Sequence, residues 1–572
     1  MQDDGKSASR CGAKPLGGLC AVLPLLSFPV YVRLCIISAL LSKLKMNNVP
    51  EMIKMYRFIQ SVIDIYSKKQ TVPVGRLHTP VTASLDETLS RLRADFGSSA
   101  DLTIRELNIS GIRAAVITID NMTDKQVLAE GVLMPLMCSS FTGTAGEILD
   151  ELRLKTFYTP ELLEITAYED IGERIMSGFV VIALDGCSTL LSVGLQGYAS
   201  RSISEPESDI VQRGSKEGFV EALRVNMTLI RRRLKNPMLR FETMNIGNIS
   251  NTEIALCYLS DRASPDILAR LKKRLSQVPL DTVLTAGYLV PFLEEEKDRS
   301  FFTGVGISER PDTVCGKLTE GRIAVLVDGV PSALIVPYIF AEYFQSLDDY
   351  SNRAYFATFT RLLKYCAFFI SVMLPGLFVA LGTFEPEMFP TLMLNKIAAS
   401  IASTPLSLTA ETILILFIYE IMREAGLRMP RPLGYAVSIV GGLVVGDTAV
   451  NAGLIGAPTL MVIAISAISS YVVPDLYAPS AILRMLFTIV GGLLGIWGTA
   501  LLLCVVLVNL CGKSSFGVPY TAPVTPSSPF AFRDVLIRAD WKILSKRTET
   551  IQDMPGADTK PDAGNNGRSD TR

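Results

Sequence analysis

The sequence predicts an α/β cytosolic module of two related subdomains, followed by an all-α transmembrane domain with several spans. Three observations lead to this fold class. The composition changes near residue 365, after which long stretches carry no charge. The half before that point alternates helical and strand-like segments. Two of its segments, 178–186 and 321–329, look alike, which indicates an internal repeat.

These changes divide the chain into five expected parts: an N-terminal extension and linker (1–84), a first α/β subdomain (85–240), a second (241–345), a transmembrane domain (346–512) and a C-terminal tail (513–572), disordered at its end. The uncharged stretch 15–32 follows three basic residues and resembles a signal peptide or an anchor. Prolines and Arg33 interrupt that pattern. The other interpretation is an upstream extension, with the start at Met46 or Met52, so we leave open whether residues 1–50 belong to the mature protein.

Short apolar runs rich in β-branched residues predict buried strands at 114–119, 179–184, 254–259 and 323–327. In the two similar segments the run ends in Asp-Gly, at Asp185 and Asp328, and a second apolar run follows. Asp-Gly between two such runs is typical of a hairpin turn. Metal-binding carboxylates at strand ends are the alternative, but a turn requires no further partner and we favour it. We place the division between the two repeats near 235–250.

Several stretches of the C-terminal third are long and apolar enough to cross a bilayer, which takes about 20 residues. The uncharged runs 365–384, 448–474 and 485–511 are the strongest of these. Two weaker ones are 397–422, which contains two glutamates, and 432–446, which is short. The sequence therefore predicts four to six membrane segments. Gly491 and Gly495, four residues apart, indicate close helix packing.

Basic residues flank the predicted spans in three places, before residue 365, at 423–431 and after residue 512. Such residues are typical of cytoplasmic loops, so all three places are expected on the cytoplasmic side of the membrane. Five crossings would put the C-terminal tail outside. An inside tail requires a re-entrant segment or a sixth crossing near 388–404, and the sequence leaves this open.

The segment 213–235 is expected to form a helix with acidic residues early and basic residues late, which suits the helix dipole. Glu217, Glu221 and Arg224 are spaced to share one face of such a helix. Three arginines follow at its end, Arg231, Arg232 and Arg233. They are consistent with a solvated helix end, with an anion site or with a subunit contact.

Charged and polar groups at membrane depth are costly, so they usually face a cavity or a partner. Glu411 is the main candidate, in a stripe with Ser407 that Pro405 interrupts, and it faces either a polar pathway or a structural partner. Glu420 is nine residues further on, about 180° around a helix, so the two cannot line one straight face. Asp447, beside Asn451 at an expected helix break, is a second candidate.

Most classes of enzyme are disfavoured by composition. His78 is the single histidine of 572 residues, so zinc sites of the HExxH type are excluded and a Ser-His-Asp triad would depend on it alone. The ten cysteines include no CxxC pair, and no phosphate-binding glycine loop follows a strand. A net charge of −1 gives no general attraction to nucleic acid. We expect a non-enzyme without cofactor or metal.

Several ordered segments resemble the A subunit of the spore germinant receptors, the GerA family. They are DLTIREL (101–107), RSISEPESDIVQRGSKEGFVEALRVNMTLIRRR (201–233), ERPD (309–312), EGRIAVLVDG (320–329), QSLDDY (345–350), REAGLRMPRPLG (423–434) and SFGVPYTAP (515–523). The similarity runs over about 95–540, a region that contains no histidine.

The resemblance implies a multi-pass subunit of the spore inner membrane that works with a transporter-like B subunit and a lipoprotein C subunit. Nutrient binding in the family is generally assigned to the B subunit. The A subunit is expected to form a homo-oligomeric ring, a nutrient-gated ion channel that releases monovalent cations to trigger germination. In such a ring one carboxylate becomes a ring of charges that favours cations, and Glu411 is our candidate for it.

Three positions depart from the family's usual pattern. Glu385 stands in place of a histidine, Leu416 in place of a glutamate, and Asp447 in place of a glutamine. The family also often has proline at the position of Ser407. Two other functions stay open: an accessory or scaffold subunit of a germination complex that senses no nutrient itself, and a solute carrier subunit with alternating access.

Overall fold

A computed structural model describes most of the chain after residue 78. The described residues are 79–97, 99–156, 161–197, 206, 209, 211–295, 300–429, 446–527, 531–545 and 550–558. The expected N-terminal extension as far as His78, and the short apolar stretch 432–445, lie outside these residues.

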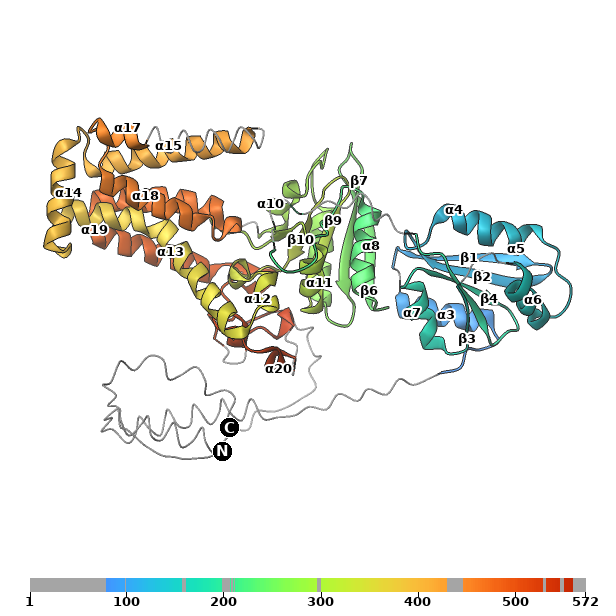
Figure 1. Ribbon diagram of the computed structural model, residues 1–572. Helices are drawn as coiled ribbons and strands as arrows, with labels where there is room; N and C mark the ends of the chain where they lie inside the picture. The colour runs from blue at the N-terminus through green and yellow to red at the C-terminus, as the bar shows by residue number, and fades with distance from the viewer. Residues whose placement is uncertain are drawn as a thin grey trace, which may run out of the picture. The chain divides into compact units, whose positions relative to one another are not determined.

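Two five-stranded antiparallel sheets form the α/β half, and both are labelled in Figure 1. The first has the order β1-β2-β4-β5-β3, and the second the order β6-β7-β9-β10-β8. The strands of the first sheet are β1 (Leu102–Ile109), β2 (Ile112–Ile119), β3 (Leu162–Ile165), β4 (Phe179–Leu184) and β5 (Leu190–Gly194). Those of the second are β6 (Leu239–Ile246), β7 (Thr252–Leu259), β8 (Gly306–Ser308), β9 (Ile323–Val327) and β10 (Ala333–Val336). The four predicted strands are present, and the equivalent strand orders confirm two related subdomains.

Helices cover both faces of each sheet, which is why the middle strands β4 and β9 are apolar at every position. In β9, Ile323, Val325 and Val327 face one apolar cluster, and Ala324 and Leu326 face the opposite one. One face of the first sheet packs against α3 (Leu85–Phe96) and α7 (Tyr168–Ile175). The opposite face packs against a segment that contains α4 (Lys125–Leu128), η2 (Ala129–Leu133), α5 (Met134–Cys138), α6 (Ala145–Glu151) and η3 (Leu152–Thr156). One face of the second sheet packs against α8 (Leu223–Arg233) and α11 (Pro311–Thr319). The opposite face packs against α9 (Pro265–Ser276), η4 (Ala286–Leu289) and α10 (Val290–Leu293).

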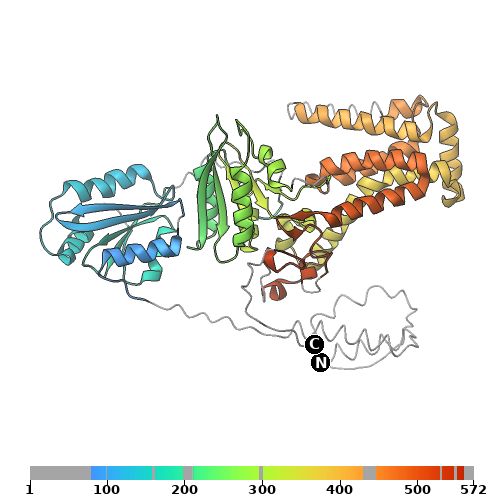
Figure 2. The ribbon, with the colours of Figure 1, turned by 180° about the vertical axis from the view of Figure 1, so that it is seen from behind.

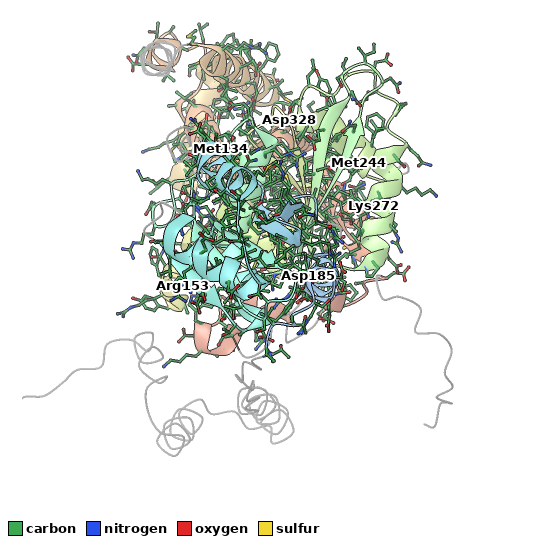
Figure 3. The ribbon with its side chains drawn as sticks, turned by 90° about the vertical axis from the view of Figure 1, so that its right-hand side faces the viewer. Met134, Arg153, Asp185, Met244, Lys272 and Asp328 are labelled. Atoms are coloured by element: carbon green, nitrogen blue, oxygen red, sulfur yellow. The ribbon has the colours of Figure 1, made fainter. Side chains whose placement is uncertain are left out.

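Asp185 and Asp328, labelled in Figure 3, occupy the hairpin turns that the sequence predicts. Each also holds the start of a helix. Asp185 Oδ1 accepts a hydrogen bond from the Leu85 amide at 3.1 Å, and Asp328 Oδ1 accepts one from the Leu223 amide at 3.1 Å. The Leu85 amide, together with Arg113, lowers the pKa of Asp185 below its ordinary value. These carboxylates therefore serve as helix caps at equivalent places of the two repeats.

The boundary between the subdomains differs from the expected one. Helix α8 packs in the core of the second sheet, where Met227 and Ile230 join Phe241. Phe219, ahead of the helix, belongs to the same cluster. The second subdomain therefore begins before Phe219 rather than at 241, because the apolar face of α8 is buried against β6, β7 and β9.

Helices make up the C-terminal half of the described chain: α12 (Leu347–Ser351), α13 (Ala354–Phe384), η6 (Pro386–Met388), α14 (Thr391–Ser403), α15 (Leu408–Arg428), α17 (Gly446–Asn451), α18 (Ala457–Ser470), η8 (Pro474–Leu476) and α19 (Tyr477–Gly512). By length and composition, two of them could cross a membrane, α13 and η8 with α19. The bent pair of α14 and α15 would be a third. Helix α14 lies across one end of this region in both views of the ribbon (Figures 1 and 2).

Two predicted spans are not continuous helices. The stretch 448–474 is divided into α17 and the 14-residue α18, because residues 452–456 are not helical. Helix α19 is broken at Gly495, whose φ of 65° and ψ of −153° are not helical. A Cβ added at Gly498 would lie 3.2 Å from the carbonyl oxygen of Val490, although eight residues of continuous helix span about 12 Å. Helix α19 therefore folds back on itself at Gly495.

The glycines predicted to pack helices have different roles. A Cβ added at Gly491 would lie 2.4 Å from the carbonyl oxygen of Gly376 in α13, so the two backbones touch there. Gly495 is the turn between the two arms of α19, and Phe384 at the end of α13 packs over it.

The C-terminal segment returns to the second subdomain. It contains β11 (Ser514–Ser515), β12 (Val518–Pro519), η9 (Ala531–Asp534), α20 (Trp541–Leu544) and η10 (Ile551–Asp553). Phe516, Val518 and Ile551 are buried in the same cluster as α9 and β9. The sequence predicts that the end of the tail is disordered. Residues 550–558 instead pack on this cluster, because Ile551 and Met554 provide apolar side chains for it.

Candidate functional site

The predicted membrane carboxylate lies at a bend between two helices. Helices α14 and α15 meet at 79°, and the break between them contains Pro405. Ser407 is the N-cap of α15, where its Oγ accepts a hydrogen bond from the Ala410 amide at 3.4 Å. Glu411 follows in the first turn of α15. A proline that ends one helix and a serine that caps the next explain this local geometry.

A second helix start meets Glu411 at this bend. The amide of Gly456, the N-cap of α18, donates a hydrogen bond to Glu411 Oε1 at 2.8 Å. A Cβ added at Gly456 would lie 2.4 Å from Ser400 Oγ, so glycine is needed for this approach. A Cβ added at Gly453 would lie 3.3 Å from the carbonyl oxygen of Ser403. The break before α18 is therefore packed against the break before α15.

The side chain of Glu411 is only 1% exposed, and backbone amide groups stabilise its negative charge. Helix N-termini favour negative charge, and two of them, those of α15 and α18, converge on this carboxylate. Within the described part of the chain, no Lys or Arg lies within ion-pair distance of Glu411. The site is thus a buried carboxylate held by two helix starts, without a basic partner there.

Asp447 and Asn451 lie on α17, at the same end of the helical region as the bend, and both are exposed (Figures 1 and 2). Their spacing of four residues places them on one face of that short helix. Ser407 is also exposed. The described contacts include none between Glu411 and either Asp447 or Asn451. These three exposed side chains and the buried Glu411 remain a predicted polar site.

The helical region also contains an ion pair that the sequence did not predict. Arg484 in α19 is 1% exposed, and its Nη2 donates to Glu420 Oε1 of α15 at 2.6 Å. The uncharged run that predicts a span begins at residue 485, directly after Arg484. Its position one residue before a long apolar stretch was the available signal. By spacing alone, the neighbours of Glu420 on α15 are Arg423 and Glu424.

The segment predicted to contact another subunit is only partly helical, which corrects the expectation. Helix α8 starts at Leu223, so Glu217 and Glu221 lie ahead of it and do not share a helix face with Arg224. The cause is the capping of Leu223 by Asp328, a residue distant in sequence. Arg224 instead pairs with Glu253 of β7 at 2.6 Å.

The three arginines at the end of α8 are bound to carboxylates of their own chain. Arg231 is fully buried, and its Nε lies 2.7 Å from Asp101 Oδ2 of the first subdomain. Arg232 and Arg233 reach Glu217 at 3.0 and 2.6 Å. Burial alone would raise the pKa of Glu217, but these two hydrogen bonds lower it below its ordinary value. A subunit contact through this segment stays a prediction.

The described residues contain no group of three or more His, Cys, Asp or Glu that could hold a metal ion. A cavity of about 420 Å³ lies between the second subdomain and the C-terminal segment, lined among others by Lys317, Glu342 and Trp541. Lys317 Nζ is 2.6 Å from Glu342, so these two charges satisfy each other.

Comparison with known proteins gives consistent matches over most of the chain. The model of the Bacillus/Clostridium GerA spore germination protein family matches residues 90–550. Spore germination protein KA of Bacillus subtilis (strain 168) is 35% identical over 491 residues, which cover 84% of this chain and 90% of that protein. Spore germination protein GerLA of Bacillus cereus is 32% identical over 473 residues, covering 82% of this chain and 96% of that protein.

Matches also occur among solved structures. One of them is the N-terminal domain of the A subunit of the Bacillus megaterium spore germinant receptor GerK3, with 28% identity and a TM-score of 0.37, covering 46% of this chain and 99% of that chain. Because the family model spans the repeated sheets, the helical region and the returning C-terminal segment together, the chain belongs to the GerA family of spore germination proteins.

Proposed function

We propose that the chain is the A subunit of a germinant receptor in the spore inner membrane, and that a ring of its copies forms a nutrient-gated channel for monovalent cations. The receptor would also contain a transporter-like B subunit and a lipoprotein C subunit. The observation that carries the channel proposal is Glu411, a buried carboxylate at the meeting point of two broken helices, with no basic partner among the described residues.

The surface of the helical region supports a multi-pass membrane position. Large apolar side chains are exposed along α13, α15 and α19, among them Phe359, Phe417, Leu493, Trp497 and Val508. A patch of this kind is stable only against lipid or another subunit. The apolar arms of α19, on either side of Gly495, are each about long enough for one crossing.

Both ends of the helical region are attached to the second subdomain and its flanking segments, which supports an even number of crossings. At the start of α13, Arg361 Nε lies 2.8 Å from Asp349 of α12. At the end of α19, Lys513 Nζ lies 3.3 Å from Glu294 and also donates to the carbonyl of Phe302. An even number places the α/β module and the C-terminal segment on one side, the cytoplasmic or core side by the charge of the flanks.

A buried carboxylate without a basic partner suits a cation path. In a ring, one Glu411 from each copy would give a ring of negative charge, which favours cations over anions. The exposed side chains Ser407, Asp447 and Asn451 would form the polar mouth of that path. In the described conformation Glu411 is covered, so opening would require the helix starts at the bend to separate.

The test is bilayer recording of the purified full-length protein in a KCl gradient, with the Glu411→Gln variant. We expect conductance in the wild type and a K⁺ over Cl⁻ preference reduced by about fivefold or more in the variant, because the ring of charge is lost. The control is Glu424→Gln, on the exposed surface of the same helix, which should leave the preference unchanged. Unchanged selectivity in Glu411→Gln would reject this carboxylate as the pore group.

One observation favours a carrier as the second candidate. Helices broken near a buried carboxylate, with their N-termini directed at it, also occur at the binding sites of transporters. Saturable flux coupled to a solute, without conductance, would support that function. Absence of any flux, in a protein that germination still requires, would support a scaffold subunit.

A further inference from the structure

A buried ion pair joins α15 to the first arm of α19. Both carboxylate oxygens of Glu420 are used: Arg484 Nη2 donates to Oε1 at 2.6 Å, and Tyr477 Oη donates to Oε2 at 2.7 Å. The guanidinium of Arg423 lies over the Tyr477 ring, 3.4 Å from its centroid. Two residues of α15 and two of α19 therefore form one cluster. We call the ion pair at its centre the Glu420–Arg484 pair.

The pair is also connected to two further helices. Arg484 Nη1 is 3.4 Å from Ser466 Oγ of α18, and Ser466 Oγ donates to the carbonyl oxygen of Ser371 in α13 at 2.7 Å. Ser466 and Ser371 are both buried. The guanidinium of Arg484 in α19 thus contacts α15 and α18 directly, and Ser466 connects it to α13.

Charges of this kind are rare in the helical region. Among the described residues from 365 to 512, Glu420–Arg484 is the one ion pair with a fully buried partner. The neighbouring pair Glu424–Arg428 has both side chains exposed. An exposed pair contributes little to stability, whereas removing one partner of a buried pair leaves an uncompensated charge.

The cluster is close to the contact with the second subdomain. Val473 and Leu476, in and next to η8, pack with Phe302 and Phe344 in one apolar cluster. Helix α19 begins directly after η8, and Arg484 follows its first residue by seven positions, about 10 Å along the helix. A displacement of the second subdomain would therefore move the arm that contains Arg484.

We infer that the Glu420–Arg484 pair is a latch that holds the subunit in its resting, non-conducting conformation. This inference rests on the proposed channel function. Its basis is that the pair is intact in a conformation in which Glu411 is covered. Because the pair ties α15 to α19, it opposes a movement of α15 that would open the bend at its start.

The experiment measures basal flux, so no nutrient is needed. The full-length protein is reconstituted in vesicles of phosphatidylethanolamine and phosphatidylglycerol loaded with KCl, and K⁺ release is followed. Arg484→Gln and Glu420→Gln should each raise basal release by about tenfold or more, because loss of one partner destabilises the resting state. Tyr477→Phe removes one hydrogen bond and should raise release less. Glu424→Gln is the matched control and should match the wild type.

The double variant with the charges exchanged, Glu420→Arg with Arg484→Glu, restores attraction and should release less K⁺ than either single variant. Basal release equal to wild type in both single variants, at equal amounts of protein in the vesicles, would overturn the latch. So would single variants that reach the membrane in wild-type amounts and only lower K⁺ conductance. Where single variants accumulate poorly, Tyr477→Phe supplies the same comparison with a smaller change. If the wild type shows no conductance under any condition, the channel function itself fails.

Discussion

The two α/β subdomains share a design but differ in what is attached to them. Both have the same strand order, an Asp-Gly hairpin and a carboxylate that caps the helix ahead of the first strand. The second subdomain also receives the C-terminal segment in its core and holds the flanks of the helical region. The first carries none of these attachments within the described residues.

The first subdomain is joined to the second by a compact polar contact. Arg231 of α8 binds Asp101 through two hydrogen bonds of 2.7 and 2.9 Å, and the Ala100 amide donates to the Phe241 carbonyl at 2.8 Å. The same fold, used twice, therefore serves once as the base of the helical region and once as an attached module. Three predictions test that difference.

The largest effect is expected at the contact between the subdomains. Arg231→Met leaves Asp101 buried without its partner, which costs about 3–5 kcal/mol. Hydrogen exchange at the Ala100 amide of the full-length protein should therefore accelerate by roughly 100-fold or more. Arg232→Met is the control, because that side chain and its partner Glu217 are partly exposed and a change below about 1 kcal/mol is expected. Equal exchange in both variants would show that the contact does not depend on Arg231.

The second-largest effect is expected where the C-terminal segment packs on the second subdomain. Ile551 is fully buried against the second sheet, and its amide donates to the Glu320 carbonyl at 2.8 Å. Ile551→Ala should destabilise this packing by about 2–4 kcal/mol through loss of apolar contact and a cavity. The rate of hydrogen exchange at the amide of residue 551 should rise accordingly. Peptides of the first subdomain should exchange at wild-type rates. Ile537→Ala, at an exposed position of the same segment, is the control. Faster hydrogen exchange in the first subdomain of this variant would contradict the separate roles of the two subdomains.

The smallest effect tests the shared design. Asp185→Ala and Asp328→Ala each remove the acceptor for one helix-starting amide, Leu85 or Leu223. Exchange at the corresponding amide should increase by about fivefold in each case, the size expected for loss of a cap. The two increases should be similar. A difference of more than about tenfold would show that the two turns, despite their likeness, are not equivalent.

Local patterns in the sequence were sufficient for much of the fold. The apolar runs located the central strands, the Asp-Gly turns located two hairpins, and the charge-free stretch ahead of Glu385 located α13. The helix expected at 213–235 begins instead at Leu223, because its start is fixed by Asp328, which is 105 residues away. Periodicity within a segment contains no information on such a partner.

The candidate site was predictable only in part. Glu411 stood out as a carboxylate in an apolar stretch, but its hydrogen bond to the Gly456 amide depends on where two helix breaks meet. Arg484 was missed because its partner, Glu420, lies 64 residues earlier and on another helix.

The alternation of strands and helices, the internal repeat, the apolar helical region and the family can be predicted from the sequence. Each of these depends on neighbouring residues or on ordered motifs. Three features become visible only in the folded chain: α8 packs on the second sheet, α19 reverses at Gly495, and the C-terminal segment returns to the second subdomain. The physical reason is that burial and ion pairing join residues that are distant in the chain, and composition does not specify which of them meet.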